Sequence, residues 1–328
     1  MNEFKLPGEQ PDKLVTRATG ETNPTYGCQP NKRPLSQLIN YGLIILDKPA
    51  NPTSHEVAAW VRKILGCSKT GHGGTLDPAV TGVLPTALGQ ATRAVRILLK
   101  AGKEYVAVLK LHDSVPESKI RETLKEFQGE IYQRPPLKSS VKRVLRVRKI
   151  YYLETLEVAE KRVLFRVGCE AGTYIRKLCY DIGVILAVSG QMEELRRTKS
   201  GIFREENSIR LQDLLDAKIL YDETGNEEEL REIIRPFEEL FVNYPKIIVR
   251  DLAINALCYG AKLAIPGVLK LSKGIEKGTP VVIMSQKGEA VALATALLNT
   301  KTILEASSGL CAKIDTVFMG RDVYPKSW

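Results

Sequence analysis

The sequence predicts an α+β fold, in which a larger domain with a mixed or antiparallel sheet is followed by a small C-terminal β-barrel. Strand-type and helix-type runs follow one another without strict β-α-β alternation, which argues against a purely parallel sheet. After residue 245 the chain changes to short β-type runs separated by glycines, as in small β-barrels. A length of 328 residues suits about two domains. We therefore expect an extension over residues 1–40, a main domain over 41–245 and a barrel over 246–328.

The first elements follow from proline content and apolar runs. Residues 1–40 carry five prolines among polar residues, which favours an extended segment, either a disordered tail or an arm lying on another domain. Residues 42–46 form an apolar run that predicts a buried strand. Residues 105–111 are apolar on both faces and predict a central strand, and alternation over 163–167 predicts another.

Apolar stripes of helical spacing predict the helices. Thr53 and Glu56 have the spacing of a capping box, and Gly66 closes the stripe that they open. Asp251 is expected to cap a short helix that runs through Cys258. The expected stripes are Val57, Trp60, Val61, Ile64 and Leu65; Leu84, Leu88, Ala91, Val95 and Leu98; Ile120, Leu124 and Phe127; Ile175, Leu178, Cys179, Ile182 and Leu186; and Leu230, Ile233, Ile234, Phe237 and Leu240.

The charge balance points to a polyanionic partner. A formal charge of +10 and a pI near 9.2 favour nucleic acid, against the alternative of a generally basic surface. From Lys138 to Lys149 six basic residues, including Lys142, Arg143 and Arg146, occur without an acidic one. Such a run suits phosphate tracking, and its alternative is an edge strand protected from aggregation by charge.

Other function classes are excluded by what the composition lacks. The six cysteines form no Cys-x-x-Cys pair and the chain has three histidines, so we expect no metal site, no zinc and a reducing compartment. No apolar run approaches the ~20 residues of a membrane span, and Met1 to Lys5 does not begin a signal peptide. We therefore expect a cytosolic protein with no membrane partner.

One stretch carries the candidate chemistry. Residues 71–85 hold four glycines and two prolines, which force tight turns, and we expect a rigid loop that is neither strand nor helix. Within it lie His72 and Asp77, and the helix expected after it offers Arg93 and Arg96. A carboxylate on such a loop is a candidate nucleophile or base, although an isolated Asp-Pro pair is usually a turn. No Gly-Lys-Ser or Gly-Lys-Thr follows the glycines, which excludes a phosphate-loop nucleotidase.

Several blocks together resemble one enzyme family. The loop from Gly71 to Pro78 is similar to the catalytic motif of TruB-type RNA pseudouridine synthases, and the C-terminal module resembles a PUA domain. The proline-rich extension and Arg134-Pro135-Pro136-Leu137 resemble the branch of dyskerin and its archaeal homologues, the catalytic subunits of H/ACA ribonucleoproteins. The blocks that match in order are Leu46-Asp47-Lys48-Pro49, Gly102-Lys103-Glu104-Tyr105, Gly172-Thr173-Tyr174-Ile175-Arg176, Glu194-Leu195-Arg196-Arg197-Thr198, Val249-Arg250-Asp251 and Tyr324-Pro325-Lys326.

The resemblance implies the roles of individual residues. It makes Asp77 the nucleophile, which either attacks the sugar or assists formation of a glycal, and Arg176 the cation that pairs with it and favours its charged form. It implies that Tyr105 stacks on the uracil with its hydroxyl near the carbon that loses a proton. The implied pocket and support residues are His72 for the flipped base, Tyr174 for the base site, Leu195 for an apolar wall, and Lys48 with Pro49 beneath the loop.

The resemblance also implies partners. The chain would isomerise uridine in rRNA and tRNA, without a cofactor, guided by base pairing to an H/ACA guide RNA. The expected RNA-binding residues are Lys142, Arg143 and Arg146, with Lys262 in the basic PUA module. The expected partner proteins are a small zinc-ribbon-like one, a glycine-arginine-rich-type one and a kink-turn binder. A stand-alone enzyme for the tRNA T-loop uridine is a variant, and a non-catalytic RNA-binding scaffold is the alternative. A cytoplasmic, archaeal-type location is expected because the lysine-rich tails of nucleolar members are missing.

Overall fold

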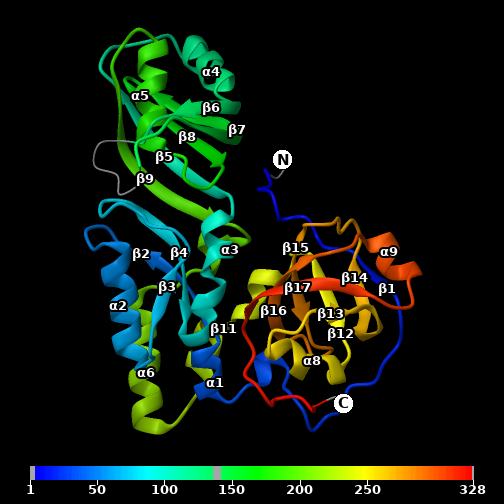
Figure 1. Ribbon diagram of the computed structural model, residues 1–328. Coiled ribbons are helices and arrows are strands. Elements are labelled where there is room, and N and C mark those ends of the chain that lie inside the picture. The colour runs from blue at the N-terminus through cyan, green and yellow to red at the C-terminus, as the bar shows by residue number, and fades with distance from the viewer. Residues whose placement is uncertain (1–3, 136–141, 327–328) are drawn as a thin grey trace.

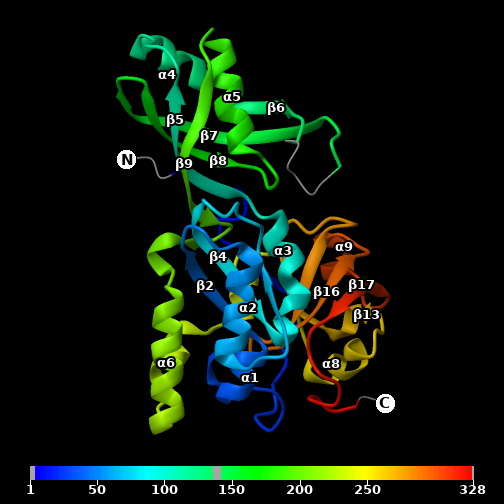
Figure 2. The same ribbon diagram turned by 90° about the vertical axis from the view of Figure 1, so that its left-hand side faces the viewer.

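The computed structural model describes residues 4–135 and 142–326. They form two bodies, each with its own sheet, which lie side by side in two perpendicular views (Figures 1 and 2). The expectations for Lys138 and for Pro136-Leu137 lie outside the described residues. In the described ranges no helix is both long and apolar enough to cross a bilayer.

The larger body contains a mixed sheet, which confirms the predicted fold class. Its strands run in the order β11-β2-β4-β9-β5-β8-β7-β6, with β3 paired to β4 and β10 to β9. All pairs are antiparallel except β4 with β9. The strands are β2 (Gly42–Lys48), β3 (Thr70–His72), β4 (Thr81–Leu88), β5 (Lys103–Leu111), β6 (Gly129–Gln133), β7 (Arg146–Ala159), β8 (Arg162–Cys169), β9 (Gly190–Ser200), β10 (Phe203–Arg204) and β11 (Arg235–Pro236).

Helices cover this sheet in two groups, one over each half of it (Figure 1). α2 and α6 pack together beside β2, and α4 and α5 pack beside β5, β7 and β9. Two separate apolar clusters lie beneath them, one around Ile44 and Leu84 and one around Leu109 and Phe165. The helices are α1 (Leu35–Asn40), α2 (Ser54–Leu65), α3 (Val95–Lys100), α4 (Glu117–Glu126), α5 (Ile175–Ile185), α6 (Leu211–Thr224) and α7 (Glu228–Ile233).

The smaller body is a sheet that surrounds its own apolar core, with strands in the order β1-β14-β12-β15-β16-β17-β13. Residues of the N-terminal extension supply its edge strand, because Leu14–Thr16 pairs with Lys270–Ser272. The elements are β1 (Leu14–Thr16), β12 (Lys246–Val249), α8 (Asp251–Cys258), β13 (Leu263–Ala264), β14 (Val268–Ser272), β15 (Pro280–Met284), β16 (Ala290–Ala296), α9 (Thr300–Glu305) and β17 (Leu310–Val317).

The extension is therefore an arm that contacts both bodies. Leu6 is buried, and Phe4 stacks on Tyr152 of β7 with ring centroids 4.8 Å apart. Farther along, Arg17 donates to the carbonyls of Ile303 and Ala306, each at 3.0 Å. The two bodies also share one apolar cluster, in which Phe237 of the larger body packs against Phe318 of the smaller. The interface between them is a continuous core and not a flexible joint.

Several local predictions are confirmed. Thr53 and Glu56 form the expected capping box, and Gly66 ends α2 in the left-handed region with φ +61°. The strands over 42–46, 105–111 and 163–167, and the helices that bury Ile120 and Ile175, occur where the patterns place them. Trp60 is an exception, because it is 45% exposed on the outer face of α2.

Three other predictions are wrong. The stripe from Leu84 to Leu98 is not one helix, because Leu84 and Leu88 belong to the fully buried strand β4 and helix begins only with a 3-10 turn at Gly89. The apolar set over 230–240 is interrupted at Pro236, where β11 pairs with β2. Asp251 does not cap α8, since it is the helix's first residue and its carboxylate accepts from Thr22 and from the Asn23 backbone N–H.

Candidate active site

The glycine-rich stretch is a short loop between two strands. His72 belongs to β3 and residues 81–85 belong to β4, so the expected loop over 71–85 is correct only for residues 73–80. Pro85 has no N–H to donate, and β4 tolerates it because its backbone faces away from β2. Its carbonyl accepts from the Gly73 N–H at 2.8 Å, just beyond the end of β3.

Buried side chains fix this loop from below. Lys48 has no exposed surface, and its Nζ donates to the carbonyls of Pro49, Pro78 and Val80 at 2.8–3.0 Å. Ser54 Oγ accepts from the Leu76 N–H at 2.9 Å. The backbone on either side of Asp77 is therefore held rigidly while the Asp77 side chain stays open to solvent.

The carboxylate of Asp77 is paired with Arg176. Arg176 is the second residue of α5, ninety-nine positions along the chain, and its Nη2 donates to Asp77 Oδ2. The Asp77 side chain is 54% exposed and the Arg176 side chain 44%, so the pair lies at an open surface that a large substrate can reach. An arginine in this position restricts the carboxylate to one orientation.

Tyr105 lies next to this pair, on β5. The register sets Tyr105 opposite Arg197 and Ala107 opposite Leu195 on β9, so these side chains share one face of the sheet. Burial raises the pKa of the Tyr105 hydroxyl, and the positive charge of Arg197 acts against that effect. The arrangement offers a ring, a neutral hydroxyl and an apolar wall to a flat ligand above Asp77.

Arg197 is the residue that the sequence patterns do not single out. It is 1% exposed, and its guanidinium donates to the carbonyls of Val83 at 2.7 Å and Gly74 at 3.1 Å. No carboxylate contacts it in the described ranges, and burial lowers its pKa. A buried cation without a counter-ion is costly. Its partners are one carbonyl before Asp77, one carbonyl after it, and the Tyr105 hydroxyl. Arg197 therefore places a fixed positive charge beneath the Asp77 loop.

Gly82 makes this arrangement possible. Its φ is +106°, and a Cβ there would lie 2.2 Å from the Arg197 carbonyl oxygen. Any side chain would force β4 and β9 apart where they pair in parallel. The glycine therefore brings the strand after Asp77 against the strand that carries Arg197.

A second buried cation, Lys103, lies under the same loop. Its Nζ donates to the carbonyls of Leu98 at 2.8 Å and Ala101 at 2.7 Å, and its Cε lies 3.6 Å from the position of a Cβ on Gly74. Burial and the charge of Arg197 lower the pKa of Lys103 to about 7. Lys103 belongs to the motif Gly102-Lys103-Glu104-Tyr105, but only the fold shows that it is buried.

His72 lies behind the loop. Its ring packs edge-on against His55 of α2 with centroids 4.8 Å apart, and its buried Nδ1 has no hydrogen-bond partner in the part of the chain that the structure describes. Burial, with smaller effects from the charges of His55 and Arg197, lowers the pKa of the His72 imidazole to about 4. The ring is therefore neutral near pH 7.

The remaining expected residues divide between this site and more distant surfaces. Tyr174 precedes α5, and its backbone is held by both ends of the Gln133 amide at 2.9 and 3.1 Å. Arg143 and Arg176 line the same open cavity of about 500 Å³, together with Arg134, Lys177 and two exposed tyrosines. The other expected RNA-binding residues, Lys142, Arg146 and Lys262, lie outside that cavity, with Lys262 on the smaller body.

Arg93 and Arg96 do not reach the loop. Arg93 donates to the carbonyl of Val317 at 3.0 Å, and Arg96 lines a cavity between the two bodies. Their strand-to-helix segment turns toward the smaller body because Leu84 and Leu88 are fixed in the sheet. Among the described residues no group of His, Cys, Asp and Glu could hold a metal ion.

Four family models match successive parts of the chain. They are described as a DKCLD (NUC011) domain over residues 2–58, a TruB family pseudouridylate synthase N-terminal domain over 62–175, a tRNA pseudouridylate synthase B C-terminal domain over 176–242 and a PUA domain over 245–318. Together they cover both bodies and the arm.

Whole-length relatives and structures agree with these matches. Probable tRNA pseudouridine synthase B of Methanosarcina barkeri is 53% identical over 99% of this chain and 96% of its own length. The Pyrococcus abyssi protein of the same name is 54% identical over 96% of this chain and 95% of its own.

Two solved structures share the fold. A chain in an H/ACA RNP bound to a substrate RNA containing 2'-deoxyuridine superposes with a TM-score of 0.94 at 49% identity, covering 99% of this chain and all of that one. A chain in a Cbf5-Nop10-Gar1 complex gives a TM-score of 0.93 at 51% identity, over 98% and 99% of the two chains. The resemblance inferred from the motifs is thereby confirmed, and the chain belongs to the TruB family of pseudouridine synthases, in the form that ends in a PUA domain.

Proposed function

We propose that this pseudouridine synthase isomerises uridine in rRNA and tRNA as the catalytic subunit of a guide-RNA-dependent H/ACA ribonucleoprotein, with Asp77 as its nucleophile. The observation that carries the assignment of the site is the pairing of Asp77 on the loop with Arg176 on α5, beside Tyr105. The cavity that Arg176 shares with Arg143 extends the site along a basic, tyrosine-bearing surface suited to an RNA backbone and its bases.

The reaction exchanges no atoms with a second substrate. The bond between N1 and the sugar C1' breaks, the uracil turns, C5 bonds to C1', the proton on C5 leaves and N1 gains one. Asp77 either bonds to C1' or assists removal of a sugar proton to give a glycal, and both routes need its carboxylate held in one orientation. The Arg176 pair and the carbonyls held by Lys48 supply that orientation.

The other residues of the site act on the base. The uridine must leave its stack, which costs a few kcal/mol, and the Tyr105 ring, Tyr174 and Leu195 offer replacement contacts. We assign the neutral His72 ring, packed against His55 behind the loop, to support of the site for the flipped base. Removal of the C5 proton needs a base, for which we propose the Tyr105 oxygen. Burial holds this hydroxyl in its neutral form, and Arg197 acts against that effect by favouring the phenolate, the form able to accept a proton.

The partners are inferred from the structural relatives. The related structures are an H/ACA RNP with substrate RNA and complexes with Nop10 and Gar1, which supports a guide RNA and small protein partners here. We infer a zinc-ribbon-like, a glycine-arginine-rich-type and a kink-turn-binding protein among them. The tRNA pseudouridine synthase B name of the archaeal relatives supports action on tRNA, and we infer the T-loop uridine as the target and a cytoplasmic location.

Tritium release from carbon-5-labelled uridine tests the function. It is measured on a tRNA transcript, and on a target paired to an H/ACA guide with partner proteins added, for the native chain, Asp77→Asn and the control Asp213→Asn. Asp213 is also paired with an arginine but lies on α6. We expect Asp77→Asn to lose at least about a thousandfold in rate with RNA binding retained, and Asp213→Asn to lose nothing. RNA binding without release by the native chain would leave only the scaffold function.

A further inference from the structure

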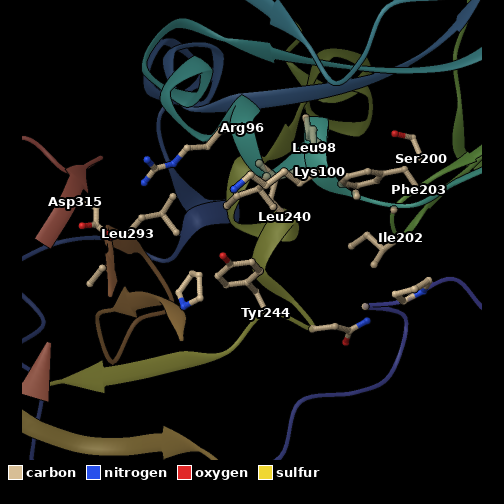
Figure 3. A pocket seen from close by; sticks show the side chains of 18 of the residues that line it. Arg96, Leu98, Lys100, Ser200, Ile202, Phe203, Leu240, Tyr244, Leu293 and Asp315 are labelled. Atoms are coloured by element: carbon tan, nitrogen blue, oxygen red, sulfur yellow. The ribbon is translucent and has the colours of Figure 1, made fainter. Parts of the chain in front are cut away.

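A cavity separate from the active site lies between the two bodies. Its volume is about 450 Å³, and its walls come from α3, from the turn between β9 and β10, from the segment before β12 and from β16 (Figure 3). That size is within the ~300–1,000 Å³ of small-molecule sites. Most of the wall is apolar, and it includes Leu98, Ile202, Phe203, Leu240, Tyr244 and Leu293.

One polar group in this wall has no partner. Ser200 is fully buried, and its Oγ makes no hydrogen bond to any residue in the described ranges. A buried hydroxyl without a partner is destabilising, and such groups are rare in native structures. Ser200 belongs to the cavity wall although its Oγ is closed off in this conformation, so a bound molecule with a polar atom at that end would satisfy the hydroxyl once the side chain rotates toward it.

The opposite end of the cavity is charged. Figure 3 shows Arg96 and Asp315 at the side away from Ser200, and Lys100 also lines the cavity. Asp315 accepts a hydrogen bond from Thr295 at 2.7 Å, whereas neither Arg96 nor Lys100 has an ion pair within residues 4–135 and 142–326. Two cations and one carboxylate leave a net charge of +1, which favours a singly charged anion over a polyphosphate.

From these observations we propose that the cavity between the two bodies binds a small amphipathic monoanion, with its apolar body among Leu98, Phe203 and Leu293, its charged group at Arg96, and a polar atom at Ser200. The walls come from both bodies, so the bound molecule adds contacts across their interface. Ser200 also ends β9, the strand that carries Leu195 and Arg197 into the active site.

Two fluorescent probes of the same shape test the charge. The first is 8-anilinonaphthalene-1-sulfonate and the second is N-phenyl-1-naphthylamine, which has the same rings without the sulfonate. Binding is followed by fluorescence and by calorimetry on the full chain. We expect one molecule of the sulfonate per chain, bound several times more tightly than the neutral amine.

Three variants locate the binding. Arg96→Gln, at an exposed position, should weaken binding of the sulfonate by about 3–10-fold. Arg93→Gln, three residues earlier on the same segment and outside the cavity, should leave that binding unchanged. Ser200→Ala should weaken it by a similar factor with no fall in Tm, because the hydroxyl has no partner to lose.

Different results would overturn the proposal. They are several sulfonate molecules per chain, equal binding of the neutral amine, or sulfonate binding that neither Arg96→Gln nor Ser200→Ala weakens. An Arg96→Gln variant that loses RNA affinity and keeps sulfonate affinity would instead make Arg96 part of an RNA-binding surface.

Discussion

Replacement of the buried Arg197 by methionine should damage the active site far more than the same replacement at its neighbour Arg196. The methionine keeps the buried volume but leaves the carbonyls of Val83 and Gly74 without their donor. Each unsatisfied buried carbonyl costs about 1–3 kcal/mol, and removal of a buried unpaired cation offsets part of this. We therefore expect the free energy of unfolding to fall by about 2–4 kcal/mol.

The reaction should slow as well, even where the variant remains folded. Gly74 and Val83 flank the Asp77 loop, so their release moves the carboxylate relative to the Tyr105 ring, and a displacement of about 1 Å can cost about a hundredfold in rate. We expect kcat to fall by about that factor with KM within about threefold, since RNA is held mainly outside the pocket. The pH at which kcat rises with the ionisation of Tyr105 should move higher, because the Tyr105 hydroxyl loses a positive neighbour.

The assay is tritium release under conditions where the variant stays folded, with urea unfolding in parallel. Arg196→Met is the matched control, because Arg196 is the neighbouring residue but pairs with Asp47 and Glu205 on the other face of β9. It should keep kcat within about threefold. A folded Arg197→Met variant with normal kcat, or an equal loss in the Arg196→Met control, would refute the role of Arg197 in positioning the loop.

Three further outcomes follow from buried charges. The pKa of His72 is about 4 in the folded chain and 6.5 in an exposed histidine, so between these values only the unfolded chain binds the extra proton. Lowering the pH from 6.5 to 4 should therefore reduce the free energy of unfolding by about 1–2 kcal/mol, after allowance for partial exposure. In urea titrations His72→Gln should lack this pH dependence. Lys103 has a pKa of about 7 in the folded chain, so between pH 7 and 10.5 the unfolded chain binds its proton and the folded chain does not. The free energy of unfolding should therefore rise over this pH range, and Lys103→Met should lack that rise. A rise that persists in the variant would assign the titration to another group. Arg33 and Glu238 form a buried ion pair, with side chains 8% and 7% exposed, and Glu238 also accepts from the Ala290 N–H. Arg33→Met should lower the free energy of unfolding by about 3–5 kcal/mol, whereas Arg121→Met, in an exposed pair, should lower it by under about 0.5 kcal/mol. Equal losses in thermal or urea unfolding would contradict the role of burial.

Much of the site was predictable because it is coded in short local patterns. Asp77, Tyr105 and Arg176 each stand in a compact motif: among glycines, after Lys103-Glu104, and after Tyr174-Ile175. The structure brings these three residues together. The apolar runs of β2 and β5 were predictable for the same reason, since strand burial leaves a local signature in the sequence.

What the sequence alone determined here is therefore the α+β class, the family and the residues of the motif. The tertiary structure decided that Arg197 and Lys103 are buried cations beneath the loop, that Leu84 and Leu88 lie in a strand, and that the N-terminal arm joins both bodies. These features depend on which segments far apart in the chain pack together. A local pattern cannot encode that choice, because the stabilising partners lie in other segments. Arg197 contacts Gly74 and Val83, more than a hundred residues before it, and Leu84 pairs with Leu46 of β2.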